Sequence, residues 1–131
     1  MIIKYPSIIP IKRKNIFKGK TYILMDHKTS SAATYFVSAI KCNKIAILVG
    51  EEATQPLISN GDVHGFSLPN TKMKCYSSMS TYYFPCSENR NDSVKPDYEV
   101  KFTIEDLLNN RDKCLEYTLE LIDRDIIKTK Y

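Results

Sequence analysis

The sequence lacks any long apolar run. No stretch approaches the roughly 20 apolar residues that cross a bilayer, and the start MIIKYPSIIPIKRK has no uninterrupted apolar core of the kind found in secretion signals. With 131 residues, 43% of them hydrophobic and four of them glycine, the composition is that of one globular domain. We therefore expect no membrane span and no second folded domain.

Closely spaced cysteine pairs are also missing. No CxxC pair occurs, which argues against a zinc knuckle. A chain of this length can bury enough surface to fold without disulfides. We therefore predict unpaired thiols, and we expect no metal and no other cofactor. The four cysteines are Cys42, Cys75, Cys86 and Cys114.

Acidic residues are absent from the first 20 positions, which hold six lysine and arginine residues in a chain of net charge +4. Pro6 and Pro10 disfavour a helix there. We predict a basic extended arm over residues 1–18 and a folded domain over residues 19–131. A basic arm can bind phosphate backbones. No aromatic stacking platform accompanies it, so nucleic acid is not the expected partner.

Two apolar segments frame a helix in the first half of the chain. KTYILMD is a β-prone run that ends near Asp26. Residues 31–43 carry apolar side chains at helical spacing, and the hydroxyl residues before them suit a helix N-cap. Residues 45–51, IAILVGE, are almost continuously apolar. The order strand, helix, strand predicts a βαβ unit and a sheet that is at least partly parallel.

The second half changes character. GDVHGFSLPNTKMKCYSSMSTYYF predicts two antiparallel strands joined near residues 69–72. Residues 86–97 are polar and bounded by proline, which predicts a surface loop. An apolar stripe predicts an amphipathic helix over residues 104–124, broken near NNRD, with Thr103 and Asp106 at capping-box spacing.

Three hydroxyl residues, Thr29, Ser30 and Ser31, stand between the first strand and the helix. A serine in the first turn of a helix lies where backbone N–H groups converge and the helix dipole is positive. That environment would stabilise the oxyanion formed when the serine attacks a carbonyl. The same residue types are also ordinary helix caps. Position alone leaves both interpretations open.

The stretch DHKTSSAATYFVSAIKCNKIAILVGEEAT resembles the nucleophile-bearing segment of the tail-specific, or carboxyl-terminal processing, serine proteases. The resemblance continues in family order through NGDVHGFSLPNTKMKCYSSMSTYYF, KPDYEV and TIEDLLNNRDKCLEYTLELI, and so covers residues 19–123. It implies an α/β fold of the crotonase/ClpP-like kind, with a mixed sheet, a βαβ core, an antiparallel hairpin and a C-terminal helix. It also implies a serine-type peptidase that cleaves unstructured polypeptide.

The resemblance places the nucleophile on Ser31, with Ser30 as the neighbouring candidate. It gives the backbone N–H of Ser31, or that of Ala32 beside it, a part in the oxyanion hole. Where one branch of the family has a lysine base, this chain aligns Gln55 and Pro56, and no lysine occurs between positions 44 and 72. The family's upstream Asp-Leu-Arg-x-Asn-x-Gly-Gly stretch is also missing. The chain thus resembles the carboxyl-terminal half of a catalytic domain, and we expect little activity from it alone.

Two histidines are candidate bases, because an unperturbed imidazole titrates near pH 6.5. His27 precedes Ser31 by four positions, and His64 lies in the predicted hairpin. His27 is the stronger candidate, although an exposed residue at a strand end would explain it equally. We expect Glu51 and Glu52 to order a loop and not to act as bases.

A non-catalytic function on the same fold is the alternative. The retinoid-binding proteins of the photoreceptor matrix are similar in this segment and lack the lysine base, so the fold could hold a lipid or peptide with Ser31 as a cap. In either case we expect an exposed edge or apolar face that self-association or a partner chain covers. The family resemblance implies a periplasmic or extracellular location, although the sequence carries no signal peptide.

Overall fold

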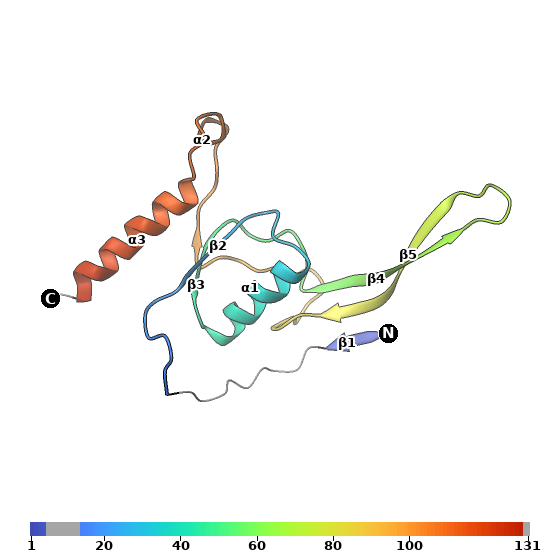
Figure 1. Cartoon of the computed structure of the whole chain (residues 1–131), viewed down its shortest axis with the longest axis horizontal. Coiled ribbons are helices and arrows are strands. Elements are labelled where there is room, and N and C mark those ends of the chain that lie inside the picture. Colours follow the sequence, from blue (N-terminus) through green and yellow to red (C-terminus); the bar gives the residue numbers. More distant parts are fainter. Residues whose placement is uncertain (5–13, 130–131) are drawn as a thin grey trace.

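The computed structural model describes residues 1–4 and 14–129. Its elements form two three-stranded sheets, one helix between them and two helices at the C-terminal end (Figure 1). Half of the predicted basic arm, residues 5–13, lies outside the described residues. None of the helices in the described part of the chain is long and apolar enough to cross a membrane.

The first sheet is parallel and has the order β2-β3-β6. Strands β2 (Tyr22–Met25) and β3 (Ile47–Gly50) are joined by helix α1 (Ala32–Asn43), which confirms the predicted βαβ unit. The sequence analysis did not predict β6 (Tyr98–Glu99), which has only two residues. Two buried clusters hold this sheet, one around Leu48 and the other around Val49, because neighbouring side chains on a strand point to opposite faces.

Gly50 ends β3 in a conformation that only glycine adopts easily. Its φ is +130°, and a Cβ added there would lie 1.9 Å from the backbone oxygen of Met25. The close approach lets β2 and β3 end side by side, with Glu51 N–H donating to Met25 O at 3.1 Å. The chain segments that follow the two strands therefore begin at the same edge of the sheet.

The second sheet has the order β1-β5-β4. Strands β4 (Ile58–Ser67) and β5 (Lys74–Tyr83) pair antiparallel from Ile58↔Tyr83 to Ser67↔Lys74, as predicted. Their hairpin projects away from the body of the molecule (Figure 1). Strand β1 (Ile2–Lys4) runs parallel to the inner end of β5.

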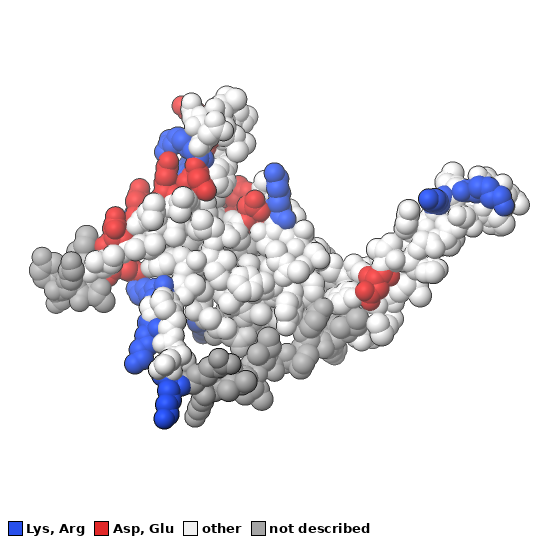
Figure 2. Space-filling view, in the orientation of Figure 1, with Lys and Arg blue, Asp and Glu red and all other residues white. Residues whose placement is uncertain are grey.

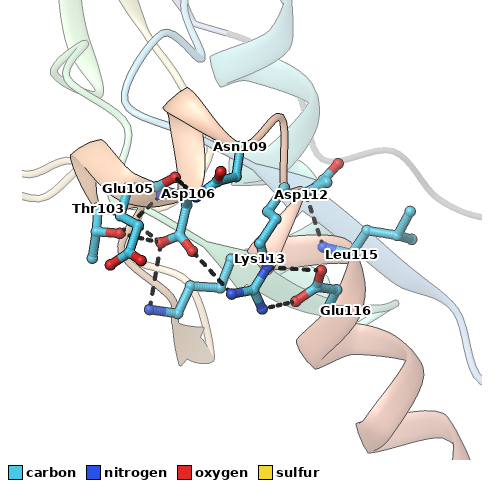
Figure 3. A network of polar contacts seen from close by, with 9 residues as sticks. Thr103, Glu105, Asp106, Asn109, Asp112, Lys113, Leu115 and Glu116 are labelled. Atoms are coloured by element: carbon cyan, nitrogen blue, oxygen red, sulfur yellow. Dashed lines mark hydrogen bonds and ion pairs between the residues drawn. The ribbon is translucent and has the colours of Figure 1, made fainter.

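The C-terminal helices are α2 (Ile104–Leu108) and α3 (Lys113–Thr129), so the predicted break near NNRD is confirmed. Figure 3 shows how the corner is held. The Asp106 carboxylate accepts from the backbone N–H of Thr103 at 2.9 Å and from its hydroxyl at 2.6 Å, and Thr103 Oγ1 accepts from Asp106 N–H. This is the predicted capping box, with Asp in place of Glu or Gln. Lys113 and Arg111 lie 3.8 and 3.7 Å from the same carboxylate.

The prediction of four unpaired thiols is wrong for two of them. Cys42, near the end of α1, and Cys86, just after β5, form a disulfide with Cα atoms 5.8 Å apart. Cys114 is buried as a free thiol, and Cys75 is a partly exposed one. A span of 44 residues hid the pair from sequence spacing, because only the fold brings the two positions together. The mixed α/β architecture itself, with parallel sheet, hairpin and C-terminal helix, is as predicted.

Candidate active site

A tight turn carries the chain from β2 into α1. Thr29 N–H donates to Asp26 O at 3.0 Å, and Asp26 N–H donates to Thr29 Oγ1 at 3.1 Å. Lys28 N–H donates to the Asp26 carboxylate at 2.9 Å. These hydrogen bonds fix the backbone of residues 26–29. Ser31 follows at the N-terminus of α1.

Ser31 has an unusual backbone. Its φ of 55° and ψ of −124° fall outside the regions that L-residues usually occupy. It stands at the N-cap position, yet its hydroxyl makes no capping hydrogen bond, so the interpretation of Ser31 as an ordinary side-chain cap is wrong. Strained residues of this kind cluster at functional sites, and a serine on a sharp turn from strand to helix is the arrangement of a nucleophile elbow.

Ser31 lines a pocket of about 360 Å³ between α1 and the second sheet. Residues from α1, from the 55–62 segment and from the end of β5 line it, so it is formed by parts of the chain that are far apart in sequence. The lining residues are Ser31, Ala32, Tyr35, Gln55, Ser59, Asn60, Gly61, Asp62, Tyr82 and Phe84. A peptide chain could enter here and bring a carbonyl to Ser31.

Gln55 lies directly beside Ser31. Its amide oxygen accepts a hydrogen bond from the Ser31 backbone N–H, and its amide nitrogen donates to Ser59 Oγ at 3.0 Å. One of the two residues that the resemblance places at the family's lysine base, Gln55, therefore contacts the predicted nucleophile. An amide is neutral and cannot take the serine proton, so Gln55 cannot act as that base.

The backbone N–H of Ala32 has no hydrogen-bond partner within residues 1–4 and 14–129. It is the first N–H of α1, and the positive end of the helix dipole lies there. A carbonyl oxygen that becomes negative at Ser31 would be stabilised by this donor. The structure thus leaves Ala32 in a suitable position for the oxyanion role predicted from the sequence.

His27 is held by Glu51, the residue after β3. Its Nδ1 lies 2.7 Å from the Glu51 carboxylate, and this hydrogen bond lowers the pKa of Glu51 below its usual value. Thr54 Oγ1 also donates to the His27 backbone oxygen at 2.7 Å. The arrangement fixes one ring nitrogen, as a carboxylate does for a catalytic histidine. No hydrogen bond links His27 to the Ser31 hydroxyl in the described part of the chain, and His27 is not among the residues that line the pocket.

The other sequence candidates lie elsewhere. His64 pairs with Ser77 in the hairpin and does not line the pocket. Ser30 uses its backbone oxygen to accept from Ala33 N–H at 3.1 Å, and its side chain does not line the pocket either. Of the two neighbouring serines, the pocket therefore favours Ser31.

Two pocket residues were missed by the sequence analysis. Asp62 and Tyr82 come from opposite strands of the hairpin, and the Tyr82 hydroxyl donates to the Asp62 carboxylate at 2.7 Å. The only signal in the sequence was an aspartate directly after a glycine inside a predicted strand, a pairing more often found in turns. The pairing of β4 with β5, in which Tyr82 lies opposite Ser59, and the long tyrosine side chain bring the two residues together.

The sequence was compared with individual curated proteins and with models of protein families. No curated protein matches. The model of Peptidase family S41 matches residues 5–100, which include β2, α1, β3, the hairpin and every pocket residue. The match extends over more than half of the 131 residues. The chain therefore belongs to peptidase family S41.

Proposed function

We propose that this chain supplies the nucleophile of a serine-type peptidase and that Ser31 forms an acyl-enzyme with a polypeptide substrate. The observation that carries the proposal is the backbone of Ser31, strained at φ 55° and ψ −124° beside a pocket, with a hydroxyl that caps nothing. Membership of a peptidase family supports the same reaction class.

The reaction has two steps. Ser31 Oγ forms a bond to the peptide carbonyl carbon, the carbonyl oxygen becomes an oxyanion beside the N–H of Ala32, and the C–N bond then breaks. The serine proton leaves with the new amine. Water hydrolyses the ester in the second step and restores the hydroxyl.

His27 is the base that we assign to this reaction. Glu51 holds its Nδ1, so the other ring nitrogen is the one that would accept the serine proton. The proposal requires this nitrogen to reach Ser31 Oγ when substrate is bound, because catalytic hydrogen bonds often tighten only in the complex. Nucleophile, base and oxyanion donor act as a unit, so the loss of any one of them removes most of the rate.

A fluorophosphonate probe tests the nucleophile. Its phosphorus is a more reactive electrophile than a peptide carbonyl, so labelling reports the nucleophile even where peptide turnover is slow. We expect the probe on Ser31 of the wild-type chain by peptide mass mapping, unchanged labelling of Ser30→Ala and none of Ser31→Ala. Equal labelling of wild type and Ser31→Ala, or no labelling of wild type, would show that the proposal is wrong.

A further inference from the structure

The pocket beside Ser31 contains one charged residue, and it is an acid. Among the ten residues that line the pocket, only Asp62 carries a charge. It is also the only acidic residue in the hairpin sequence 58–83, and Figure 2 shows red atoms on the hairpin near its junction with the body. The pocket is therefore negative at one end in the part of the chain that the structure describes.

The position of Asp62 is defined by its neighbours. The ring of Tyr82 lies so close to Gly61 that a Cβ added to that glycine would be 2.7 Å from Tyr82 Cε2. This close contact lets the Tyr82 hydroxyl reach Asp62 at 2.7 Å. Asp62 itself has a φ of 54°, which Asp tolerates better than most residues. The hydrogen bond from the Tyr82 hydroxyl helps to lower the pKa of Asp62, so its carboxylate is ionised at neutral pH.

The wall between Asp62 and Ser31 is aromatic. Phe84 lies with its ring centroid 6.1 Å from that of Tyr35, in an edge-to-face arrangement, and 6.4 Å from that of Tyr82. Phe84 is buried, while the two tyrosines are partly exposed to the pocket. Such rings bind the apolar stem of a long side chain, and their faces attract a cation.

The length of the pocket suits a long side chain. Ser59 contacts Gln55, which contacts Ser31. Asp62 follows Ser59 by three residues in the same strand, and both residues line the pocket. A substrate residue whose carbonyl lies at Ser31 would need a long stem to bring a charged end to Asp62. Lysine and arginine have such stems.

We propose that this pocket binds a lysine or arginine side chain of the polypeptide substrate and that Asp62 determines this specificity. The inference rests on the proposed function, since it takes Ser31 as the reacting residue. The stem lies along Tyr35 and Phe84, and the cationic end meets Asp62 and the face of Tyr82. An acidic side chain is rejected by the same carboxylate, and a short apolar one does not reach it.

The size of the preference follows from the exposure of Asp62. Its carboxylate is accessible to water, so an ion pair there is worth less than a buried one. With a modest contribution from the tyrosine ring, we expect a preference of about tenfold for a cation over an uncharged chain of equal length.

Peptide binding to Ser31→Ala tests the inference without any acylation. Two short peptides that differ only by lysine or norleucine at one position are titrated against this variant and against Ser31→Ala with Asp62→Asn. We expect the lysine peptide to bind about tenfold more tightly to the first protein. The advantage should fall to about twofold or less when Asp62 is neutral. Asn accepts a positive φ as well as Asp does, so the fold is preserved.

The control is Glu99→Gln, which removes an exposed carboxylate from strand β6 in the other sheet and should leave the preference unchanged. The salt dependence of binding is a second measurement that needs no variant at position 62. Screening should weaken the binding of the lysine peptide and not that of the norleucine peptide. An equal lysine advantage with Asp62→Asn, no salt dependence, or no binding of either peptide would overturn the inference. Failed fluorophosphonate labelling with an intact lysine preference would instead overturn only the proposed chemistry.

Discussion

The amide oxygen of Gln55 accepts a hydrogen bond from the backbone N–H of Ser31, which is one of the two N–H groups that flank the candidate nucleophile. An acyl oxygen that approaches Ser31 would compete for this donor. Gln55 also donates to Ser59, so its side chain bridges α1 and β4 across the pocket. In this structure the glutamine occupies the backbone donor that the proposed reaction would offer to a substrate carbonyl.

Gln55→Ala should therefore expose the donor. We expect fluorophosphonate to label Ser31 several times faster in this variant than in wild type, because the probe oxygen no longer competes with the amide. Gln55→Glu should slow labelling, since a carboxylate holds the same N–H more strongly. The rate of labelling by mass spectrometry is the measurement. A slower rate in Gln55→Ala would mean that the glutamine assists Ser31 and does not obstruct it.

Ser31→Gly should stabilise the fold while it abolishes labelling. The strained φ of 55° costs a serine about 1–3 kcal/mol, and glycine adopts it freely but loses more entropy on folding, so we expect a net gain of about 1 kcal/mol. Urea unfolding measures the free energy. Ser30→Gly is the matched control, because Ser30 is not among the positive-φ residues, and it should not gain stability. Lower stability in Ser31→Gly would argue against backbone strain at this position.

The His27–Glu51 hydrogen bond should make stability depend on acid pH. The bond lowers the pKa of Glu51 in the folded chain, while in the unfolded chain a glutamate titrates near about 4.3. The stability that it contributes is present above about pH 4.3 and is lost as the pH falls through the lower folded value. Glu51→Gln should flatten this part of the profile in urea titrations, and Glu88→Gln, at an exposed site, should not. Identical profiles for wild type and Glu51→Gln would contradict the prediction.

The Cys42–Cys86 disulfide should contribute strongly to stability. A bond that closes a loop of 44 residues removes unfolded-state entropy worth about 4 kcal/mol. The double variant Cys42→Ser, Cys86→Ser should lose about this amount in urea unfolding. Cys75→Ser should lose much less, because Cys75 is a free thiol. Equal midpoints for the oxidised and reduced wild-type chain would refute the bond.

The fold elements follow from local patterns more closely than the site does. The spacing of hydrophobic residues was enough to predict β2, α1, β3, the hairpin and the break before α3. The strands β1 and β6 have three and two residues, too few for any periodicity to be visible. The positive φ of Ser31 could not be predicted from the sequence, because serine has no preference for this conformation. Tertiary contacts must impose it.

We expect this chain to associate with a second copy or with a partner chain, because it exposes large apolar side chains. Large apolar side chains are exposed at both ends, with Met73 and Tyr76 on the hairpin and Ile104 and Leu108 at the α2 end.

Charge differs between these two ends. Figure 2 shows basic side chains at the tip of the hairpin and mostly acidic ones over α2 and α3. We expect sedimentation velocity at micromolar concentration to show oligomers of this chain. If a different partner chain covers the apolar surface, adding that partner should replace the oligomers. The double variant Tyr76→Ser, Leu108→Ser should weaken the association, so that oligomers form only at a higher protein concentration. A wild-type chain that remains monomeric at every concentration would contradict this expectation.

The pocket lies between two sheets that share no strand. Ser31 and Tyr35 come from the unit of β2, α1 and β3, while Tyr82 comes from β5 of the other sheet and Phe84 directly follows that strand. The width of the pocket can therefore change without breaking any strand pairing. Cys42 near the end of α1 and Cys86 just beyond β5 join the two sides covalently. The disulfide therefore limits how far α1 and the end of β5 can move apart on either side of the pocket.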